Sequence, residues 1–544
     1  MSRKGHSQLR LTLRRSHGAL VFAMLALLVS GCVRGPVLVS SEQQKPLDRS
    51  ISETPAGMAM TCIAEGLTAP TAFCFDLTEG EHKGTKLIAE SGVGGSDPRI
   101  YGITPDARII NIYPQGRSIP FLHRGFEVYA PIGGMVVVEG KILVSHRDHR
   151  GMGVITAFSY DGSHSTVVAD LPAQGDYSVT DIALNPVDGR IYFGVGAATN
   201  SGVVGIDNWQ IGWVNDYPRF CDLPMGMIKL LGYRFDTKNP KAGLWGGADI
   251  AVTAPFQPFN SSNQTRVSPA PGGKPSSAIY SCSPGGGDLR VEAHGIRLPR
   301  GIAIDNYGQA YFTNNGMEMR GTRPVKDDPD ALLKLTRGTW YGFPDYTADL
   351  NPSSDPRYQP PVELILPFGY PELSSLLDNA ASSPSLQSPT QYRTSLVYGA
   401  FPSQSGAAKF AIVPETGPFK EFAGEAIVAL SGDRAPFATS GRKLVGPIGY
   451  KVVVVNLDRA RKPIRDFVRN TSGMPASMLP NEPVALERPV DVKFGPDGAL
   501  YILDFGRMTV ANGKEKVSAG TGRIFRVAPI EAPSHPTTAP TTSE

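Results

Sequence analysis

The stretch DIALNPVDGRIYFGVG, residues 181–196, contains two runs of apolar and β-branched residues around a turn at Asp188-Gly189. Alternation of apolar and polar residues on both sides of a turn with glycine predicts two antiparallel strands. The same pattern recurs as GIAIDNYGQAYFTNNG, residues 301–316, and as DVKFGPDGALYILDFG, residues 491–506. A strand-turn-strand unit that repeats in one chain indicates an architecture built from repeats.

Three weaker copies begin at Ala72, Gly134 and Phe419, which makes six units in all. The first three turn glycines lie 56 and then 49 residues apart, a spacing typical of propeller blades, and the later intervals are 119, 116 and 74 residues. The six glycines that open the second strand of each unit are Gly84, Gly140, Gly189, Gly308, Gly424 and Gly498.

The longer intervals predict insertions at about residues 206–280 and 317–395. Insertions in a propeller lie at strand ends, where ligands bind. A repeated two-sheet sandwich would also produce alternating strands, but it would not produce six similar turns in register. We therefore predict an all-β fold, a six-bladed β-propeller over residues 58–528 with long loop insertions on one face.

The composition agrees with an ordered, turn-rich protein. Hydrophobic residues make up 41% of the chain and charged residues 19%, with 60 glycines and 47 prolines. The formal net charge is +3, and no basic block follows the extreme N-terminus, so nothing indicates a nucleic-acid partner.

The N-terminus has the layout of an export signal. Several arginines precede the apolar run ALVFAMLALLV, which is too short for a comfortable membrane span. The run ends in VSGC, which resembles a bacterial lipobox and predicts lipidation of Cys32; the alternative is an ordinary signal peptide with a chance cysteine. We therefore expect a signal peptide at residues 1–32, a flexible tether at 33–57 and a disordered tail at 529–544. The protein would be exported, face the periplasm and be anchored to the membrane by lipid alone.

Four further cysteines remain, an even number that favours disulfides outside the cytosol and allows three pairings. We expect Cys62 to pair with Cys74 and Cys221 with Cys282. A four-cysteine zinc site is the alternative, but the paired C-x-x-C spacing is missing.

Several of these stretches resemble the soluble quinoprotein sugar dehydrogenases, the glucose/sorbosone dehydrogenase family. The resemblance spans about residues 60–528. The segments that carry it are RPVDVKFGPDGALYILDFG, residues 488–506, then GTGRIFRV, LPRGIAIDNYGQAYFTNNG and DDPDALLKLTRGTWYGFP.

The resemblance implies a six-bladed propeller that holds pyrroloquinoline quinone (PQQ) in a basic hollow with calcium at its quinone edge. Arg297 and Arg488 match arginines that face the cofactor, and Arg434 is a looser match to a third cation. Asp330 lies near the position of a calcium ligand. Such chemistry needs forked cations for the cofactor carboxylates and a hard cation for the quinone oxygen.

The chain departs from the family pattern at three of these positions. Leu298 stands where the family has an asparagine, Val490 where it has a second arginine, and Ala331 where it has an acidic neighbour of the calcium ligand.

The largest departure lies just ahead of residue 181. The family's aspartate–histidine pair, whose histidine is the catalytic base, corresponds here to Asp176 and Tyr177. A tyrosine has a pKa near 10, so it is a poor base at pH 7 unless a cation or metal lowers that value. Asp176 could take the proton instead, and His146 or His149 in the loop SHRDHRG could supply a base or bind a metal.

The leading hypothesis is therefore a PQQ- and calcium-dependent aldose or sorbosone dehydrogenase. Its electrons would pass to a separate quinone or cytochrome, because the chain has no C-x-x-C-H haem site. Two alternatives remain: a redox-inactive propeller that binds carbohydrate or protein, and a calcium-dependent lactonase-type hydrolase.

Overall fold

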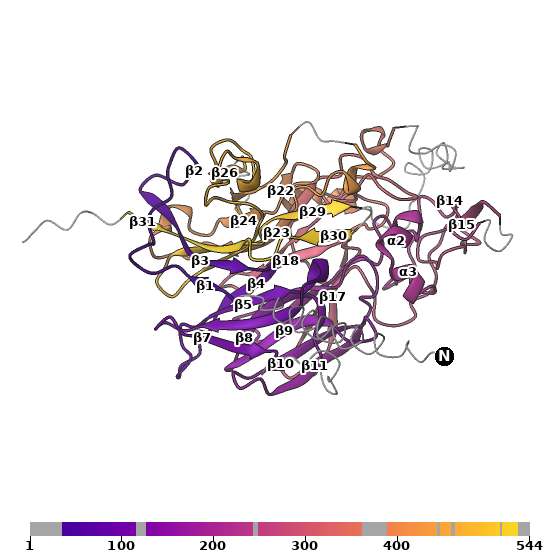
Figure 1. Cartoon of the computed structure of the whole chain (residues 1–544). Coiled ribbons are helices and arrows are strands. Elements are labelled where there is room, and N and C mark those ends of the chain that lie inside the picture. The colour runs from indigo at the N-terminus through magenta and orange to yellow at the C-terminus, as the bar shows by residue number, and fades with distance from the viewer. Residues whose placement is uncertain are drawn as a thin grey trace, which may run out of the picture.

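In the computed structural model, six antiparallel sheets surround a common axis (Figure 1). The structure describes residues 35–115, 127–242, 248–361, 389–442, 446–458, 463–511 and 514–530. The predicted signal peptide, Cys32 and nearly all of the predicted tail lie outside these ranges. None of the helices in the described ranges is long and apolar enough to cross a membrane.

Each of the first three sheets has four antiparallel strands in chain order, and the third gains a short fifth strand. Blade one comprises β4 (Pro70–Phe75), β5 (Lys86–Ser91), β6 (Pro98–Ile103) and β7 (Ile109–Tyr113), and blade two comprises β8 (Tyr129–Val138), β9 (Lys141–Arg147), β10 (Gly153–Phe158) and β11 (His164–Leu171). Blade three comprises β12 (Val179–Leu184), β13 (Ile191–Val195), β16 (Ala278–Cys282), β17 (Arg290–His294) and the parallel β21 (Thr339–Trp340).

The last three sheets follow the same plan, and the sixth is closed by the N-terminal part of the chain. Blade four comprises β18 (Pro299–Ile304), β19 (Ala310–Asn314), β20 (Asp330–Lys334) and β22 (Val397–Phe401). Blade five comprises β23 (Ala407–Ile412), β24 (Ala426–Leu430), β25 (Lys451–Val455), β26 (Arg465–Asn470) and β2 (Ser52–Glu53). Blade six comprises β27 (Pro489–Phe494), β28 (Leu500–Asp504), β31 (Gly522–Pro529), β3 (Met58–Leu67) and β1 (Val37–Leu38).

The inner strands β4, β8, β12, β18, β23 and β27 contact one another in a closed ring, which confirms the six-bladed propeller. All six turn glycines recognised in the sequence lie between the first and second strands of their blades and have φ between 67° and 84°. A side chain with a Cβ rarely adopts this left-handed conformation, so glycine at these turns has a direct backbone cause.

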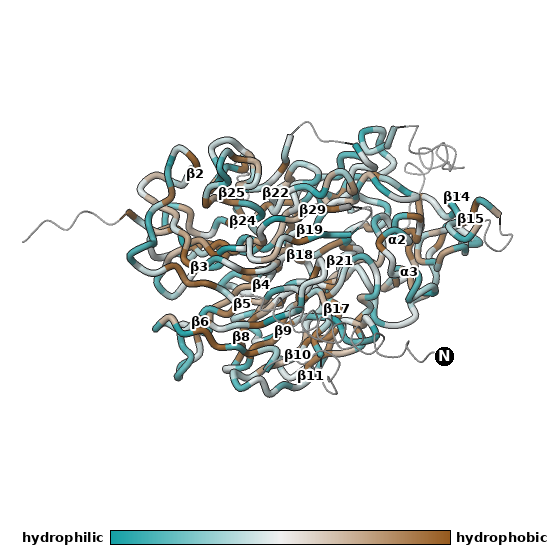
Figure 2. Tube along the Cα trace, viewed as in Figure 1, coloured by the Kyte–Doolittle hydropathy of each residue, from teal (hydrophilic) through white to brown (hydrophobic). Residues whose placement is uncertain are grey.

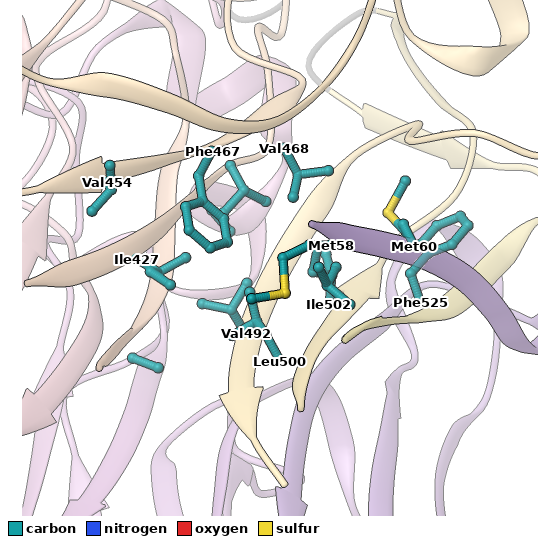
Figure 3. Close-up of a cluster of buried hydrophobic side chains, with 14 of the residues drawn as sticks. Met58, Met60, Ile427, Val454, Phe467, Val468, Val492, Leu500, Ile502 and Phe525 are labelled. Carbon is teal, nitrogen blue, oxygen red and sulfur yellow. The ribbon is translucent and has the colours of Figure 1, made fainter. Parts of the chain in front are cut away.

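Adjacent blades bury apolar faces against each other. Ile427 and Phe467 of blade five pack on Val492, Leu500 and Ile502 of blade six (Figure 3). Figure 2 shows hydrophobic residues along the strands and hydrophilic ones in many of the peripheral loops. This inter-blade burial is the main apolar stabilisation of the fold.

Residues 35–57 are not a free tether, so that expectation is wrong for the described part. Val37 and Leu38 extend the sheet of blade six by pairing with β3, and Ser52 pairs with Asn470 of blade five. Val39 and Leu47 pack against the core between these blades, so burial of apolar side chains holds the segment in place.

The long insertions gather at one end of the propeller. The first carries α2 (Ile206–Ile211), α3 (Trp213–Asp216), β14 (Phe235–Lys238) and β15 (Ile250–Thr253), which Figure 1 shows together on the side away from β31. Its Asn200 and Ser201 hydrogen-bond to the loop that contains Glu318 and Arg323, and Arg323 pairs with Asp345 of the next insertion. The other short helices in the described ranges are η1 (Val93–Gly95), η2 (Pro356–Tyr358), η3 (Pro389–Tyr392), α6 (Arg393–Leu396), η4 (Lys420–Phe422), η5 (Phe437–Thr439) and η6 (Ala476–Met478). The strands β29 (Met508–Ala511) and β30 (Lys514–Val517) form a hairpin.

Candidate functional site

A cavity of about 370 Å³ lies on the propeller axis, at the end where the insertions gather. Each of the six inner strands contributes to its wall, so the site belongs to the whole ring. This volume lies within the usual range for small-molecule sites. The contributions of the inner strands include Thr71, Gly133, Val179, Arg300, Lys409 and Val490.

Positive charge prevails in this cavity. Six cationic side chains line it against three carboxylates, so it favours an anionic ligand. The cations are Arg147, Arg297, Arg300, Lys409, Arg434 and Arg488, and the carboxylates are Asp176, Glu318 and Glu515. The predicted residues Asp176, Tyr177, Arg297, Arg434 and Arg488 are thus brought together, although they come from blades three to six.

Three of the cations form a group on the wall made by blades four to six. The Nη1 of Arg300 donates to Ser431 Oγ at 2.8 Å, and the Nη1 of Arg488 donates to the Asp433 carbonyl at 2.9 Å. Burial lowers the pKa of Arg300 to about 10, and the charges of Arg434 and Arg488 act in the same direction. The positive charges of these three side chains repel one another, and an anion between them relieves that repulsion.

The donors of this group are not fully used. Within the described ranges, Arg300 and Arg488 form no ion pair with a carboxylate. The Nε atoms of Arg434 and Arg488 are buried without a hydrogen-bond partner there. A buried donor without a partner costs about 1–3 kcal/mol. A carboxylate between these guanidinium groups would supply the missing acceptors, because forked N–H pairs match carboxylate oxygens.

Lys409 occupies the base of the cavity. Its Nζ donates to the Thr71 carbonyl at 2.8 Å and lies 3.4 Å from Asp181 and 3.6 Å from Asp491. These partners come from blades one, three and six, so Lys409 ties the inner strands together.

Tyr177 lies where the sequence placed it, just before β12, but its surroundings do not make it a base. Its phenol oxygen accepts hydrogen bonds from Arg297 and, at 3.4 Å, from Arg320. Burial raises the pKa of Tyr177 above its ordinary value although Arg297 opposes the shift. The phenol therefore keeps its proton at pH 7.

Asp176 is held by the protein itself. Its Oδ1 accepts from Trp213 Nε1 at 2.7 Å and from Asn208 Nδ2 at 2.9 Å, and its Oδ2 accepts from Arg320 Nη2 at 2.7 Å. Three donors on two oxygens leave Asp176 as an anchor for Arg320, with little freedom to take a proton from a ligand.

Arg297 is similarly committed. It donates to the carbonyl and side-chain oxygens of Asn200 at 2.7 and 2.9 Å, to the Asn315 carbonyl at 3.3 Å and to Tyr177. Four of its five N–H groups are thereby used. Arg297 lines the cavity, and its hydrogen bond to the phenol oxygen keeps the side chain of Tyr177 in position.

Glu318 lies between Arg297 and Arg320 on one side and Arg434 on the other. Burial alone would raise the pKa of this carboxyl, but Arg320, Arg434 and Arg297 lower it to about 2. Glu318 is therefore ionised throughout the neutral range, and it holds Arg434 Nη1 at 3.6 Å.

Asp330 does not line the cavity, and its oxygens are occupied by protein donors. Oδ1 accepts from the Gly316 amide at 2.9 Å, and Oδ2 accepts from the Ala407 amide at 2.8 Å and from Ser405 Oγ at 3.1 Å. These contacts join blade four to blade five. Protein donors thus occupy three of the acceptor sites of Asp330, and its role as a metal ligand stays a prediction.

The side chains that the resemblance implies for calcium do not assemble either. Across the described ranges, no group of three or more His, Cys, Asp or Glu side chains is placed to hold a metal ion. The unpaired arginine donors fit the carboxylates of PQQ, whereas carboxylate or imidazole side chains alone do not form a calcium site in the described ranges.

Histidine is absent from the described wall of the cavity. His146 is fully buried within blade two, where its Nε2 lies 2.9 Å from Thr156 Oγ1. Burial lowers the pKa of His146 to about 4. It therefore does not replace the missing base.

The predicted disulfides are not formed: all four described cysteines are free and buried. Cys62 lies in the core between blades five and six, and Cys74 in the core between blades one and two. Cys221 packs in the first insertion and Cys282 in blade three. Each thiol fills an apolar position in a different hydrophobic cluster. The four cysteines therefore serve as small buried apolar residues and not as disulfide partners.

Sequence analysis missed Arg147, Arg300 and Lys409. A usable signal existed for Arg300, which follows Arg297 by three residues at the start of an inner strand. Arg147 stands in a weak repeat, and Lys409 lies in β23, ahead of the weak repeat that was recognised from Phe419 onward.

Comparisons with models of protein families and with curated proteins find no match to this chain. Its structure is similar to those of PQQ-dependent sugar dehydrogenases, at low sequence identity. The PQQ domain of pyranose dehydrogenase from Coprinopsis cinerea is 14% identical, with a TM-score of 0.47, over 89% of this chain and 98% of that one. The PQQ-bound aldose sugar dehydrogenase from Streptomyces coelicolor is 13% identical, with a TM-score of 0.43, over 87% and 99%.

A periplasmic gluconolactonase from Pseudomonas aeruginosa is 10% identical, with a TM-score of 0.32, over 88% of this chain and 98% of that one. Similarity at these identities concerns the fold alone, so the function has to be argued from the cavity.

Proposed function

We propose that the axial cavity binds PQQ and that the protein is an oxidoreductase of the quinoprotein sugar dehydrogenase type. The observation that carries this proposal is the convergence of Arg300, Arg434 and Arg488 on one wall, with two buried Nε donors left without partners. Arg434 pairs with Glu318 and Glu515, whereas Arg300 and Arg488 have no carboxylate partner in the described ranges, so a ligand with several carboxylates would supply the missing acceptors.

PQQ, when bound, supplies an orthoquinone that accepts two electrons from a sugar. The residues of this chain would hold it through the three arginines, and Glu318 would keep Arg434 in place through their ion pair. Lys409 also lines the cavity, where Asp181 and Asp491 offset its charge. The step that removes a proton from the sugar hydroxyl has no histidine available in the described wall.

That gap favours a second candidate, a propeller that binds the anionic ligand without oxidising a sugar. Tyr177 retains its proton, and Asp176 is engaged by three donors. The hydrolase alternative depended on calcium, whose side-chain ligands do not assemble in the described ranges. We therefore take binding without turnover as the main competitor.

The cellular setting is part of the same proposal. An exported protein anchored through Cys32 would carry out this chemistry at the membrane, facing the periplasm. A separate quinone or cytochrome would take the electrons.

The test is a titration of the purified protein with PQQ, with and without calcium, followed by addition of aldoses. We expect saturable PQQ binding that weakens about tenfold or more in Arg488→Gln, because a charge-assisted hydrogen bond contributes about 1.5–3 kcal/mol. Arg469→Gln is the control, since Arg469 lies at the outer edge of blade five and pairs with Glu53.

The outcomes separate the candidates. Bleaching of bound quinone by an aldose supports the oxidoreductase, and binding without bleaching supports the binding propeller. Absence of PQQ binding would refute both the proposal that PQQ is the cofactor and the proposal that the protein is a dehydrogenase.

A further inference from the structure

The wall of the cavity formed by blades two and three holds a second, separate cation. Arg147 ends β9, and the one hydrogen bond of its guanidinium with a described residue runs from Nη2 to the Gly175 carbonyl at 2.8 Å. Its Nε is buried and has no partner in those ranges. Burial lowers the pKa of Arg147 to about 10, so the guanidinium is charged at neutral pH.

Some arginines of this protein have carboxylate partners, whereas Arg147 shares with Arg300 and Arg488 the lack of one in the described ranges. Arg323 is buried and pairs with Asp345 at 2.7 Å, and Arg150 pairs with Asp148 and Asp170. Arg147 forms no such ion pair within the described chain. Arg147 is half-buried with a fully buried Nε, and it borders the cavity, so a ligand anion has room to supply the missing partner.

Two neighbouring groups add donors to the same wall. Ser178 Oγ is buried without a described partner and lines the cavity. The phenol oxygen of Tyr177 already accepts from Arg297 and Arg320, so its own hydrogen is left to donate. Arg147, Tyr177 and Ser178 therefore present hydrogen-bond donors, and Asp176 beside them is held by Arg320.

This donor set is electrostatically distinct from the three arginines proposed to bind the cofactor. Arg300 experiences the charges of Arg434 and Arg488, whereas the ionisable groups that act on Arg147 are Tyr217 and Asp176. The two sets lie on different blades of one ring, so a carboxylate on the first does not compensate the charge of the second.

We propose that Arg147, Ser178 and Tyr177 form a second subsite that binds the carboxylate of a sugar acid, such as a uronate, beside the cofactor. The proposal rests on the proposed function, since it names the substrate class for the same cavity. A neutral sugar would leave the charge of Arg147 without a counter-ion, whereas a carboxylate accepts from the guanidinium and from the hydroxyl donors together. Sites whose polar groups must be paired discriminate strongly against ligands that cannot pair them.

The experiment is isothermal titration of PQQ-saturated protein with D-glucuronate and with D-glucose as its neutral counterpart. We expect glucuronate to bind at least about tenfold more tightly than glucose, the contribution of a charge-assisted hydrogen bond. Arg147→Gln should abolish that preference and leave PQQ affinity unchanged to within about twofold, because the two sets are independent. Arg150→Gln, three residues away and exposed, is the matched control and should change neither affinity.

A second variant guards against misfolding of the first. Ser178→Ala removes one donor without burying a new polar group, and it should weaken glucuronate binding by about tenfold or more, since a hydrogen bond to a charged acceptor contributes about 1.5–3 kcal/mol. Both variants are compared by thermal denaturation before titration.

The alternatives have distinct signatures. Equal affinities of the unmodified protein for glucuronate and glucose overturn the subsite. A loss of PQQ affinity in Arg147→Gln, with glucuronate unaffected, also overturns it and shows that one polycarboxylate spans both walls. Glucuronate binding that needs Arg147 in a protein that does not take up PQQ keeps the subsite and rejects the proposed cofactor.

Discussion

Replacing Arg320 by methionine should destabilise the fold more than any other single change at the site. Arg320 is 3% exposed and pairs with Asp176 at 2.7 Å, with Glu318 and with Asp207. Removing one partner of a buried ion pair costs about 3–5 kcal/mol, because the remaining charge is left without compensation. Three carboxylates share this cation, so we expect a loss of at least about 3 kcal/mol in the free energy of unfolding at pH 7.

The size of this loss should depend on pH. Burial raises the folded-state pKa of Asp207 to about 6 although Arg320 opposes the shift, so loss of Arg320 should raise this pKa further. A raised folded pKa means that the stability present at low pH is lost as pH rises through that pKa. The deficit of Arg320→Met relative to the unmodified protein should therefore be smaller at pH 5 than at pH 8.

Urea unfolding at pH 5, 7 and 8, followed by tryptophan fluorescence, measures these differences. Arg108→Met is the control, since Arg108 pairs with Asp106 on the surface and should change stability by no more than about 0.5 kcal/mol. A deficit below about 1 kcal/mol, or one that stays constant with pH, would refute the argument that Arg320 compensates buried carboxylates.

Three further outcomes are expected. Tyr177→His places a general base beside the cavity. The rate of sugar oxidation with PQQ should rise by about 100-fold or more in this variant, because general-base catalysis contributes at least that factor. An unchanged rate would show that a second catalytic group is missing as well. Asp330→Asn should lower the free energy of unfolding by about 1–3 kcal/mol, because a side chain that accepts from two backbone amides becomes partly a donor. The affinity for PQQ should stay the same. If the variant loses a calcium dependence that the unmodified protein has, the purely structural role of Asp330 is contradicted. The folded-state pKa of Glu318, about 2, lies below its ordinary value. Its contribution to stability is therefore complete at pH values above the ordinary pKa and is lost as pH falls toward 2. Glu318→Gln should reduce the fall in melting temperature at acidic pH, and an unchanged fall would contradict the ion pairing of Glu318.

The number of blades was predictable from the sequence because a blade is a local unit. Its strand-turn-strand core spans about sixteen residues in the clear copies, and the turn requires a left-handed backbone that marks each copy with a glycine such as Gly189 or Gly308. The position of Tyr177 ahead of the third inner strand followed from the same register.

The chemistry of the cavity was decided by the closed ring. Arg147 and Arg488 are 341 positions apart in the chain, and only closure of six blades brings them to one cavity. Whether an arginine is free for a ligand depends on its partners. Arg297 matched the family pattern and is occupied by Asn200, whereas Arg147 matched nothing and has an unpaired Nε. The sequence by itself determined the repeats and the order of the blades, because those depend on local periodicity and turn geometry. The tertiary structure alone decided which charged groups remain uncompensated, because compensation depends on contacts between residues far apart in the chain.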